Sequence, residues 1–380
     1  MSWNKIIGNE RIKKILQRAI LENRIAHAYL FTGQEGVGKD AFAIQFAKVV
    51  NCLHPQKSDE SIESCDECKS CKFFDKLTHP NFEYIFAVPS GKSDSSSDNP
   101  IDKLTEAQIE EIKSQIELKT EDNFHKITLG GSLSIRVNAI RDAKRKLSLS
   151  QSNSGRRFLL VSEAEKMNNE SANAFLKTLE EPHENVTIIL TTSKPDAILQ
   201  TIKSRCQLIK FGTLPDELIA QKLNHDMNIE MSKAIFAASL SMGSYTKAVE
   251  SFDSNLISLR ETIIEILRKS LKKKNYRIEL YDIITKFIKD TDKSQIVKAL
   301  QLLILWFRDA EILKSNPAGK LVNQDSIESI NKFVSFYLYK DFTRVITEIE
   351  NSVYLHNRNV NPQALIFALF IKIRQIFIDL

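Results

Sequence analysis

The stretch from Tyr29 to Val50, YLFTGQEGVGKDAFAIQFAKVV, constrains the fold of this chain more than any other. It begins with an apolar run that suits a buried parallel strand and ends with apolar residues at the spacing of a helix. Between them a glycine loop fits the phosphate-binding pattern, in which backbone N–H groups turn toward an anion and a lysine reaches the outer phosphates. Its residues are Gly33, Gly36, Gly38 and Lys39. The sequence therefore predicts a strand, a phosphate loop and a helix whose positive end points at the loop.

Two positions of this site depart from the pattern of an active nucleotide hydrolase. A serine or threonine normally follows the lysine and holds Mg²⁺, whereas this chain has Asp40. An aspartate normally ends the strand that supports the same ion, whereas this chain has Ser162 before Glu163. These changes predict a site defective in hydrolysis, with ATP held at most by Lys39 and the loop amides. The alternative is that Asp40 and Ser162 have exchanged roles and still hold the ion.

The first half of the chain alternates strands and helices. Strands are expected over residues 29–32, 82–88, 157–163, 186–192 and 207–211, with a further one within 126–129. Helices are expected over 6–22, 101–120 and 135–147, the last being basic and favouring a solvated face, with contact to DNA phosphates as the alternative. Residues 90–131 are interpreted as a surface insertion that begins with the polar run Ser90 to Pro100. Helical spacing continues from Leu214 to the end, so the sequence predicts an α/β domain followed by all-α structure.

Four of the five cysteines lie close together in the sequence: Cys52, Cys65, Cys68 and Cys71. The CxxCxxC spacing lets tight turns present neighbouring sulfurs to one metal ion, and four thiolates complete a tetrahedral zinc site. Because all four positions are filled by protein, the expected Zn²⁺ is structural and has no catalytic water. Free thiols and an iron–sulfur cluster are the alternatives.

Length and composition limit the possible classes. With 380 residues, of which 42% are hydrophobic, the chain is long enough for two or three domains. No apolar run has the length of a membrane span and the start has no signal-peptide core, so a cytoplasmic protein without membrane contact is expected. A net charge of +5 is compatible with nucleic acid but does not require it.

Two further stretches indicate a family. The runs AEKMNNESANAFLKTLEEP, from Ala164 to Pro182, and TTSKPDAILQTIKSRCQ, from Thr191 to Gln207, closely resemble the bacterial clamp-loader AAA+ proteins of DNA polymerase III. The front stretch HAYLFTGQEGVGK, the cysteine group and the junction near Gly243 fit the same family. The resemblance extends from residue 3 to about residue 250.

The resemblance implies a domain plan. Residues 1–212 would form an AAA+ doubly wound parallel-sheet domain that carries the zinc module (52–71) and the insertion (90–131). Residues 213–254 would form a helical lid, and residues 255–380 a helical collar for oligomerisation. In the collar, most apolar residues are expected to pack within one chain.

The resemblance also implies roles for single residues. Arg205 lies in the motif Ser204–Arg205–Cys206, whose arginine reaches the ATP of a neighbouring subunit as an arginine finger in trans. Glu163 would be the vestige of the catalytic glutamate. Thr191 to Ser193 would be the sensor-1 region, and Thr246 stands where a motor has its sensor-2 arginine. The altered positions all belong to the chain's own site, while the arginine that serves another subunit is intact.

This pattern favours an ATPase-defective scaffold that helps a motor load a sliding clamp during replication. The implied partners are motor subunits of the gamma or tau type, a delta subunit, the sliding clamp and primer-template DNA, in a hetero-oligomeric ring. Such a chain would not be an enzyme on its own but a component of the polymerase holoenzyme. The alternatives are an ATP-binding or hydrolysing motor of the gamma or tau type and, last, a nucleic-acid-binding role for the cysteine module.

Overall fold

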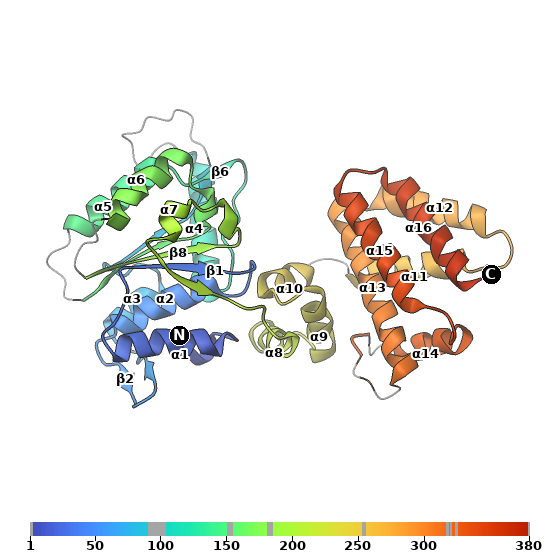
Figure 1. Ribbon diagram of the computed structural model, residues 1–380, viewed down its shortest axis with the longest axis horizontal. Helices are drawn as coiled ribbons and strands as arrows, with labels where there is room; N and C mark the ends of the chain where they lie inside the picture. Colours follow the sequence, from blue (N-terminus) through green and yellow to red (C-terminus); the bar gives the residue numbers. More distant parts are fainter. Residues whose placement is uncertain are drawn as a thin grey trace. The chain divides into compact units, whose positions relative to one another are not determined.

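The structure is a computed structural model that describes residues 3–89, 104–149, 155–180, 185–252, 256–316, 319, 321–323 and 326–378. The polar run predicted at Ser90–Pro100 lies outside these residues. The chain divides into an N-terminal unit, residues 1–222 with 242–246, and a C-terminal unit, residues 223–241 with 247–380. Figure 1 shows an α/β arrangement in the first and helices in the second. The predicted fold class, α/β followed by all-α, is therefore confirmed.

The elements of the first part of the chain alternate between strands and helices. They are η1 (Trp3–Lys5), α1 (Glu10–Leu21), β1 (Ala28–Thr32), α2 (Lys39–Val50), β2 (Gln56–Lys57), β3 (Ile62–Glu63), α3 (Lys69–Asp75), β4 (Phe82–Ile85), β5 (Val88–Pro89), α4 (Glu106–Glu121), β6 (Leu133–Ser134), α5 (Val137–Leu149), β7 (Arg157–Val161), η2 (Ala164–Lys166), α6 (Asn169–Glu180), β8 (Val186–Thr192), η3 (Pro195–Ala197), α7 (Gln200–Lys203) and β9 (Gln207–Lys210).

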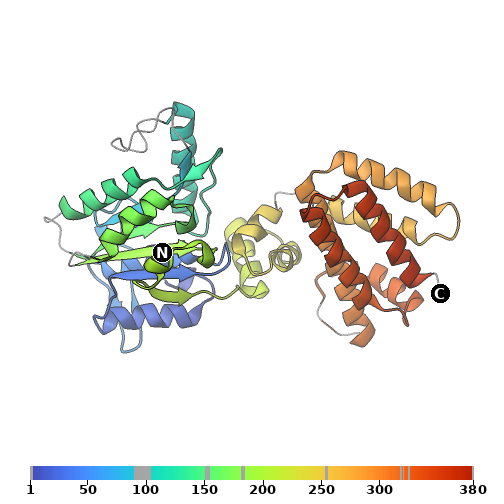
Figure 2. The same cartoon turned by 45° about the horizontal axis from the view of Figure 1, so that its top comes forward.

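The main sheet has five parallel strands in the order β4-β7-β8-β1-β9. Strand β1 lies between β8 and β9, with Leu30 opposite Leu190 on one side and Leu208 on the other. Helices α1 to α3 cover one face, and α5, α6 and α7 cover the other, as the two views show (Figures 1 and 2). The doubly wound parallel sheet predicted from the sequence is confirmed, and the carboxyl ends of β1, β7 and β8 meet at one edge.

Strand β1 is buried on both faces, which explains its unbroken apolar run. Ala28 and Leu30 belong to the apolar core shared with α5 and α6. Tyr29 instead faces α2, where its ring meets that of Phe46 at 5.7 Å in an edge-to-face contact. The phosphate loop, residues 33–39, is thus anchored at both ends by core elements.

Some element bounds differ from the sequence prediction. The first α-helix begins at Glu10 instead of residue 6, because the preceding Asn9 has a left-handed backbone. The predicted strand 82–88 divides into β4, in the main sheet, and β5, which pairs antiparallel with β6. The prediction of a strand within Lys126–Leu129 is wrong. These described residues lie in an irregular segment in which the backbone N–H of Thr128 donates to Gln115 of α4 instead of to a strand.

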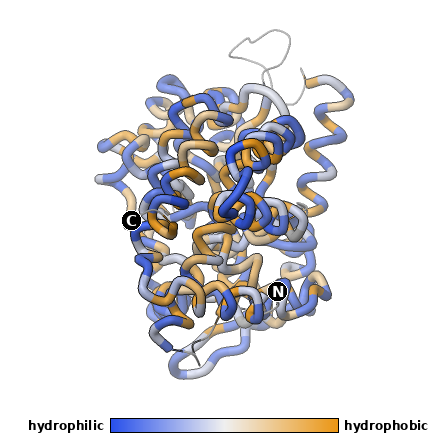
Figure 3. Tube along the Cα trace, turned by 90° about the vertical axis from the view of Figure 1, so that its right-hand side faces the viewer, coloured by the Kyte–Doolittle hydropathy of each residue, from blue (hydrophilic) through white to orange (hydrophobic). Residues whose placement is uncertain are grey.

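The remaining elements are all helices: α8 (Asp216–Met227), α9 (Met231–Leu240), α10 (Tyr245–Phe252), α11 (Leu256–Ser270), α12 (Tyr276–Asp290), α13 (Lys293–Ser315), α14 (Ile327–Phe336), α15 (Phe342–Asn357) and α16 (Pro362–Phe377). The Cα trace in Figure 3 alternates between apolar and polar residues along the helices, as expected for helices with one buried face. Among the described residues, none of the helices is long and apolar enough to cross a membrane.

Helix α13 forms the centre of the C-terminal unit and packs against α11, α14 and α15. Its side chains Leu300, Leu303 and Phe307 are fully buried in one large apolar cluster. A buried arginine, Arg374, closes the end of α11 by donating to the carbonyls of Ser270 and Lys272 at 2.8 and 2.7 Å. Most apolar residues of these helices are therefore explained by packing within the chain.

Candidate functional site

The phosphate loop closes on its own lysine. Lys39 is the first residue of α2 and is 9% exposed, and its ammonium donates to the carbonyls of Gly33 and Gln34, both at 2.8 Å. Burial lowers the pKa of Lys39, while the nearby carboxylates, Asp40 first, oppose that shift. The lysine that would reach the phosphates of a nucleotide thus bonds to loop carbonyls.

Two loop glycines are needed because neighbouring side chains pack directly against their Cα atoms, and because their backbone φ angles are positive. Gly36 has φ +76°, and a Cβ there would lie 2.2 Å from Oγ of Ser244. Gly38 has φ +89°, and a Cβ there would lie 2.6 Å from the ring of Phe124. Residues from the insertion and from the start of α10 therefore lie directly against the phosphate loop, where Tyr245 also donates its backbone N–H to the Gly36 carbonyl at 3.0 Å.

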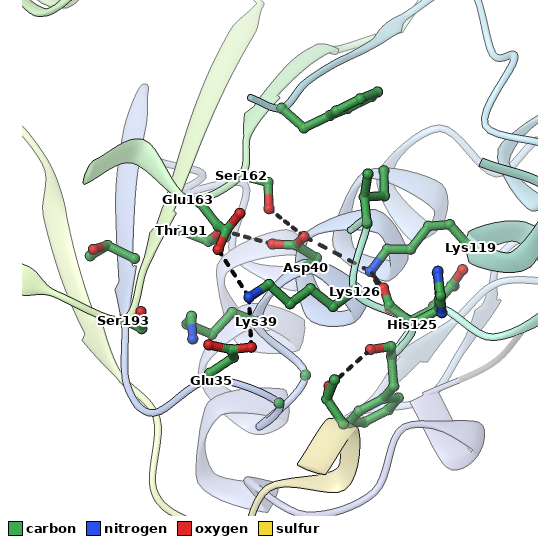
Figure 4. Close-up of a pocket in the computed structure, with 18 of the residues that line it drawn as sticks. Glu35, Lys39, Asp40, Lys119, His125, Lys126, Ser162, Glu163, Thr191 and Ser193 are labelled. Carbon is green, nitrogen blue, oxygen red and sulfur yellow. Dashed lines mark hydrogen bonds and ion pairs between the residues drawn. The ribbon is translucent and has the colours of Figure 1, made fainter. Parts of the chain in front are cut away.

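Asp40 is the centre of a buried network at the carboxyl ends of the strands. Ser162 donates to its Oδ2 at 2.6 Å, Thr191 to its Oδ1 at 2.7 Å, and Tyr84 to its Oδ2 at 3.2 Å. The ammonium of Lys119 lies 3.9 Å from Oδ2. Burial would raise the pKa of Asp40, but Lys119 and the Ser162 and Thr191 hydroxyls outweigh it and hold that pKa below its usual value. Figure 4 shows Asp40 between Ser162, Thr191 and Lys119.

Glu163, the predicted vestige of the catalytic glutamate, lies beside two lysines. Its Oε1 is 3.4 Å from Nζ of Lys126 and its Oε2 is 2.6 Å from Nζ of Lys166. Lys126 also donates to Glu35 of the phosphate loop at 2.7 Å (Figure 4). Burial opposes the charged form of Lys126, but these two carboxylates, through the bond to Glu35 first, raise its pKa. Glu163 is thus held in ion pairs.

Part of the insertion, within residues 119–127, departs from the surface location expected for it. Lys119, Asn123, Phe124 and Ile127 are each less than a tenth exposed, and they line the cavity above the phosphate loop. That cavity has a volume of about 70 Å³. Pockets that hold drug-sized ligands have about 300–1,000 Å³. The cavity is thus smaller than such a pocket in this structure, and Asp40 on its wall already accepts from hydroxyls and lies 3.9 Å from the ammonium of Lys119.

Thr246, at the predicted sensor-2 position, donates to the carbonyl of Phe124 at 3.4 Å and lines the same cavity. Ser193, in the predicted sensor-1 region, donates from its backbone and its hydroxyl to Glu165. The structure thus brings Lys39, Asp40, Glu163 and both sensor positions to one cavity.

Arg205 follows α7 and does not line that cavity. Its side chain is 36% exposed and donates to Glu180, the last residue of α6, at 2.9 Å. It also donates to the Thr201 carbonyl at 3.0 Å. The guanidinium is therefore partly exposed and lies in a weak surface pair that a stronger anion could replace.

The four predicted metal ligands converge. Their sulfurs all lie within 4.8 Å of one another, and Cys52 Sγ is 3.5 Å from Cys65 Sγ and 3.6 Å from Cys71 Sγ. A tetrahedron with bonds of about 2.3 Å has edges of about 3.8 Å, so the spacing suits a zinc ion. Backbone N–H groups of Cys65, Cys68 and Cys71 point at sulfurs of the group, which supports thiolate charge. The four cysteines can hold a metal ion.

Sequence reasoning missed the contribution of α4 and the segment after it. Lys119 stands seven residues after Ile112 and three after Ile116, on the apolar stripe of a helix. A lysine at such a position is a signal that its ammonium is buried against a specific partner. Nothing in the sequence identified that partner as Asp40, which is 79 positions away.

Comparison with known proteins places this site in a family context. Residues 8–215 match the family described as DNA polymerase III, delta subunit. DNA polymerase III subunit delta' of Bacillus subtilis strain 168 is 26% identical over 382 residues, which cover 99% of each chain. DNA polymerase III subunit tau of the same organism is 26% identical over 83% of this chain and 51% of its own length. DNA polymerase III subunit delta' of Escherichia coli strain K12 is 26% identical over 64% of this chain and 60% of its own length. These findings agree with the resemblance found in the sequence.

Proposed function

The chain belongs to the DNA polymerase III delta subunit family, and from that membership we propose that it is the delta-prime subunit of a bacterial clamp loader. In this role it is an AAA+ scaffold that hydrolyses no ATP itself. It supplies an arginine finger to a neighbouring motor and helps to load a sliding clamp on primed DNA during replication. The similarity to subunit delta' along 99% of both chains supports this choice.

The observation that carries the proposal is the state of the chain's own nucleotide site. Lys39 bonds to loop carbonyls, Asp40 to hydroxyls and Glu163 to two lysines. Hydrolysis by phosphate-loop proteins needs the lysine on the phosphates, Mg²⁺ on a hydroxyl and a carboxylate, and a free group to orient water. Each of these groups has a different partner here, which favours a scaffold over a motor.

Arg205 is the residue proposed to act outside its own chain. A guanidinium remains charged and can donate two parallel hydrogen bonds to phosphoryl oxygens as their negative charge grows in the transition state. Its partner in this chain, Glu180, is 49% exposed, so the pair is screened by water and can be exchanged for a phosphate. The alternative is a purely structural role, in which Arg205 only orients the end of α6 through Glu180.

Reconstituted complexes separate these two roles. Arg205→Ala is compared with Glu180→Gln, which removes the ion pair but keeps the arginine, and with Arg18→Ala, whose side chain is 79% exposed on α1. Arg205→Ala should leave assembly intact and slow ATP turnover at the adjacent motor site on the order of 10³-fold. Bulk turnover should fall only in part, because other sites keep their own fingers, and clamp loading should fall more. Clamp loading at the normal rate with Arg205→Ala, or an equal loss with Glu180→Gln, would refute the finger.

An active motor of the gamma or tau type is the second candidate. It is supported by the contact between Asp40 and Ser162, 2.6 Å apart, since a carboxylate and a hydroxyl at that place are the two groups that Mg²⁺ requires. The similarity to subunit tau points the same way. Lys119 opposes it, because its ammonium adds a positive charge beside the same carboxylate.

The cysteine module is proposed to hold one structural Zn²⁺. Four protein thiolates leave no position for water, so the metal would supply folding energy to the segment between α2 and β4 and take part in no reaction. Residues 52–71 contain only short elements: β2, β3 and the start of α3. A metal ion that links the four thiolates would stabilise their fold.

The partners follow from the role. We expect gamma or tau motor subunits and a delta subunit in a hetero-oligomeric ring, with the sliding clamp and primer-template DNA as substrates of the assembly, in the cytoplasm. The helices from α11 to α16 would form the collar of residues 255–380, α8 to α10 the lid of residues 213–254, and residues 1–212 the AAA+ domain.

A further inference from the structure

We propose that Lys119 is the resident cation of the nucleotide site and that the segment 119–127, named here the plug, occupies the place of nucleotide and Mg²⁺. The inference goes beyond the proposed function, which states that hydrolysis is lost but not what fills the site. It also does not depend on Arg205 or on assembly with other subunits.

The first argument is the way in which Lys119 is held. Its side chain is 3% exposed, and its ammonium donates to the carbonyls of Asn123 and His125 at 2.7 and 2.6 Å, 3.9 Å from Oδ2 of Asp40. A cation surrounded by two carbonyls and a carboxylate has the oxygen environment of a bound metal ion. A buried ammonium is stable only with such partners. Because these carbonyls belong to the turn after α4, the bonds from Lys119 also hold the plug in its conformation.

The second argument is the position of the rest of the plug. Phe124 lies over Gly38, and its carbonyl accepts from Thr246. Its ring meets that of Tyr245 at 5.3 Å, and the ammonium of Lys222 lies 5.2 Å above it. The plug is thus held by the phosphate loop, by Lys222 and by the pair Tyr245 and Thr246, which are separate segments of the N-terminal unit.

The third argument is charge. Lys126 joins Glu35 of the phosphate loop to Glu163 at the end of β7. In a nucleotide-binding protein, the anion at such a loop is a triphosphate. Here the carboxylates of Glu35 and Glu163 are the anions at this place, and lysines of the same chain neutralise them. Lys119 and Lys126 together supply two positive charges at the place where a nucleotide would require Mg²⁺. The site is therefore satisfied without a ligand.

Binding of ATP would require the plug to leave. The apparent affinity of a site that is open only part of the time is reduced by the open fraction. Variants that weaken the plug should therefore bind nucleotide more tightly than the wild-type protein, which is the reverse of the usual effect of mutating a site.

The test measures binding of a fluorescent ATP analogue with Mg²⁺ to the full chain, alone. Lys119→Met keeps the length of the side chain but removes its charge, and Lys113→Met, on the same helix with a 64% exposed side chain, is the matched control. Phe124→Ala uncovers Gly38 without changing the ion pair, in case Lys119→Met fails to fold. Lys39→Ala in each background shows whether bound nucleotide uses the phosphate loop.

The plug predicts no binding by the wild-type protein or Lys113→Met at millimolar ATP, and a gain on the order of 10²-fold in affinity in at least one plug variant, abolished by Lys39→Ala. Micromolar, Lys39-dependent binding by the wild-type protein would overturn it. Folded plug variants that bind no more tightly than the wild type would overturn it as well. Neither result would decide the proposed scaffold role, because a subunit can bind ATP without hydrolysing it.

Discussion

Replacing Asp40 by asparagine removes the negative charge from the buried network and leaves the shape of the side chain almost unchanged. The ammonium of Lys119 then lies in the interior without the carboxylate at 3.9 Å. At that separation the attraction is about 4 kcal/mol with an effective dielectric constant of about 20, and breaking one partner of a buried pair costs about 3–5 kcal/mol. Two carbonyls still hold Lys119, so we expect the free energy of unfolding of the N-terminal unit to fall by about 2–4 kcal/mol.

The two tryptophans allow each unit to be followed separately. Trp3 is 1% exposed and packs on Phe42 in the N-terminal unit, while Trp306 is buried in the C-terminal unit. In a Trp306→Phe background, fluorescence during urea unfolding therefore reports Trp3 and the N-terminal unit. This separation matters because a chain with two units need not unfold in one step.

Controls test the cause of the loss. Asp142→Asn removes a carboxylate paired with Arg145 and Lys146, whose side chains are 71% and 52% exposed, and should cost about 0–1 kcal/mol. Combining Asp40→Asn with Lys119→Met should cost less than the sum of the single changes, since the second removes the charge that the first left unpaired. A change of less than about 0.5 kcal/mol on Asp40→Asn, or full additivity of the pair, would refute the buried network as described.

Three further results are expected. Metal analysis should find one zinc ion per chain. The ion should be lost in Cys71→Ser and retained in Cys206→Ser, because Cys206 lies outside the cysteine group. Wild-type protein without zinc would contradict the site. Burial lowers the pKa of His79 to about 4, so the folded unit favours the neutral imidazole, and stability present above about pH 6.5 is lost as the pH falls toward 4. Between pH 7 and 4.5 the Trp3 transition of the wild type should lose about 2–3 kcal/mol more than that of His79→Gln, and equal losses would contradict this. Glu180→Gln should leave the Trp3 transition within about 0.5 kcal/mol of wild type because its pair with Arg205 is exposed, and a larger loss would indicate a structural arginine.

The parallel sheet and the phosphate loop could be predicted because local patterns determine them. The run of Tyr29 to Thr32 is apolar at each position but the last, as a strand covered on both faces must be, and the glycines that follow are required by their positive φ angles. The cysteine group was predictable for a similar reason, since spacing in the sequence restricts which sulfurs can meet.

The closure of the site could not be predicted, because it depends on contacts between distant residues. Asp40, at the start of α2, meets Ser162 and Thr191 at the ends of two strands and Lys119 from the insertion. The residues 126–129 have the composition of a strand, and tertiary contacts overrode that preference: Thr128 donates its N–H to Gln115 of α4, and Ile127 is buried. The sequence contained the signal of a lysine on an apolar stripe but not its partner.

ATP turnover by the purified chain, compared with Glu163→Gln, tests the central claim most directly. Since Lys39, Asp40 and Glu163 are all engaged by groups of the same chain, we predict that neither protein hydrolyses ATP above background and that the substitution changes nothing. Turnover by the wild-type chain that disappears in Glu163→Gln would show that Asp40 and Ser162 still hold Mg²⁺ and that this subunit is a motor.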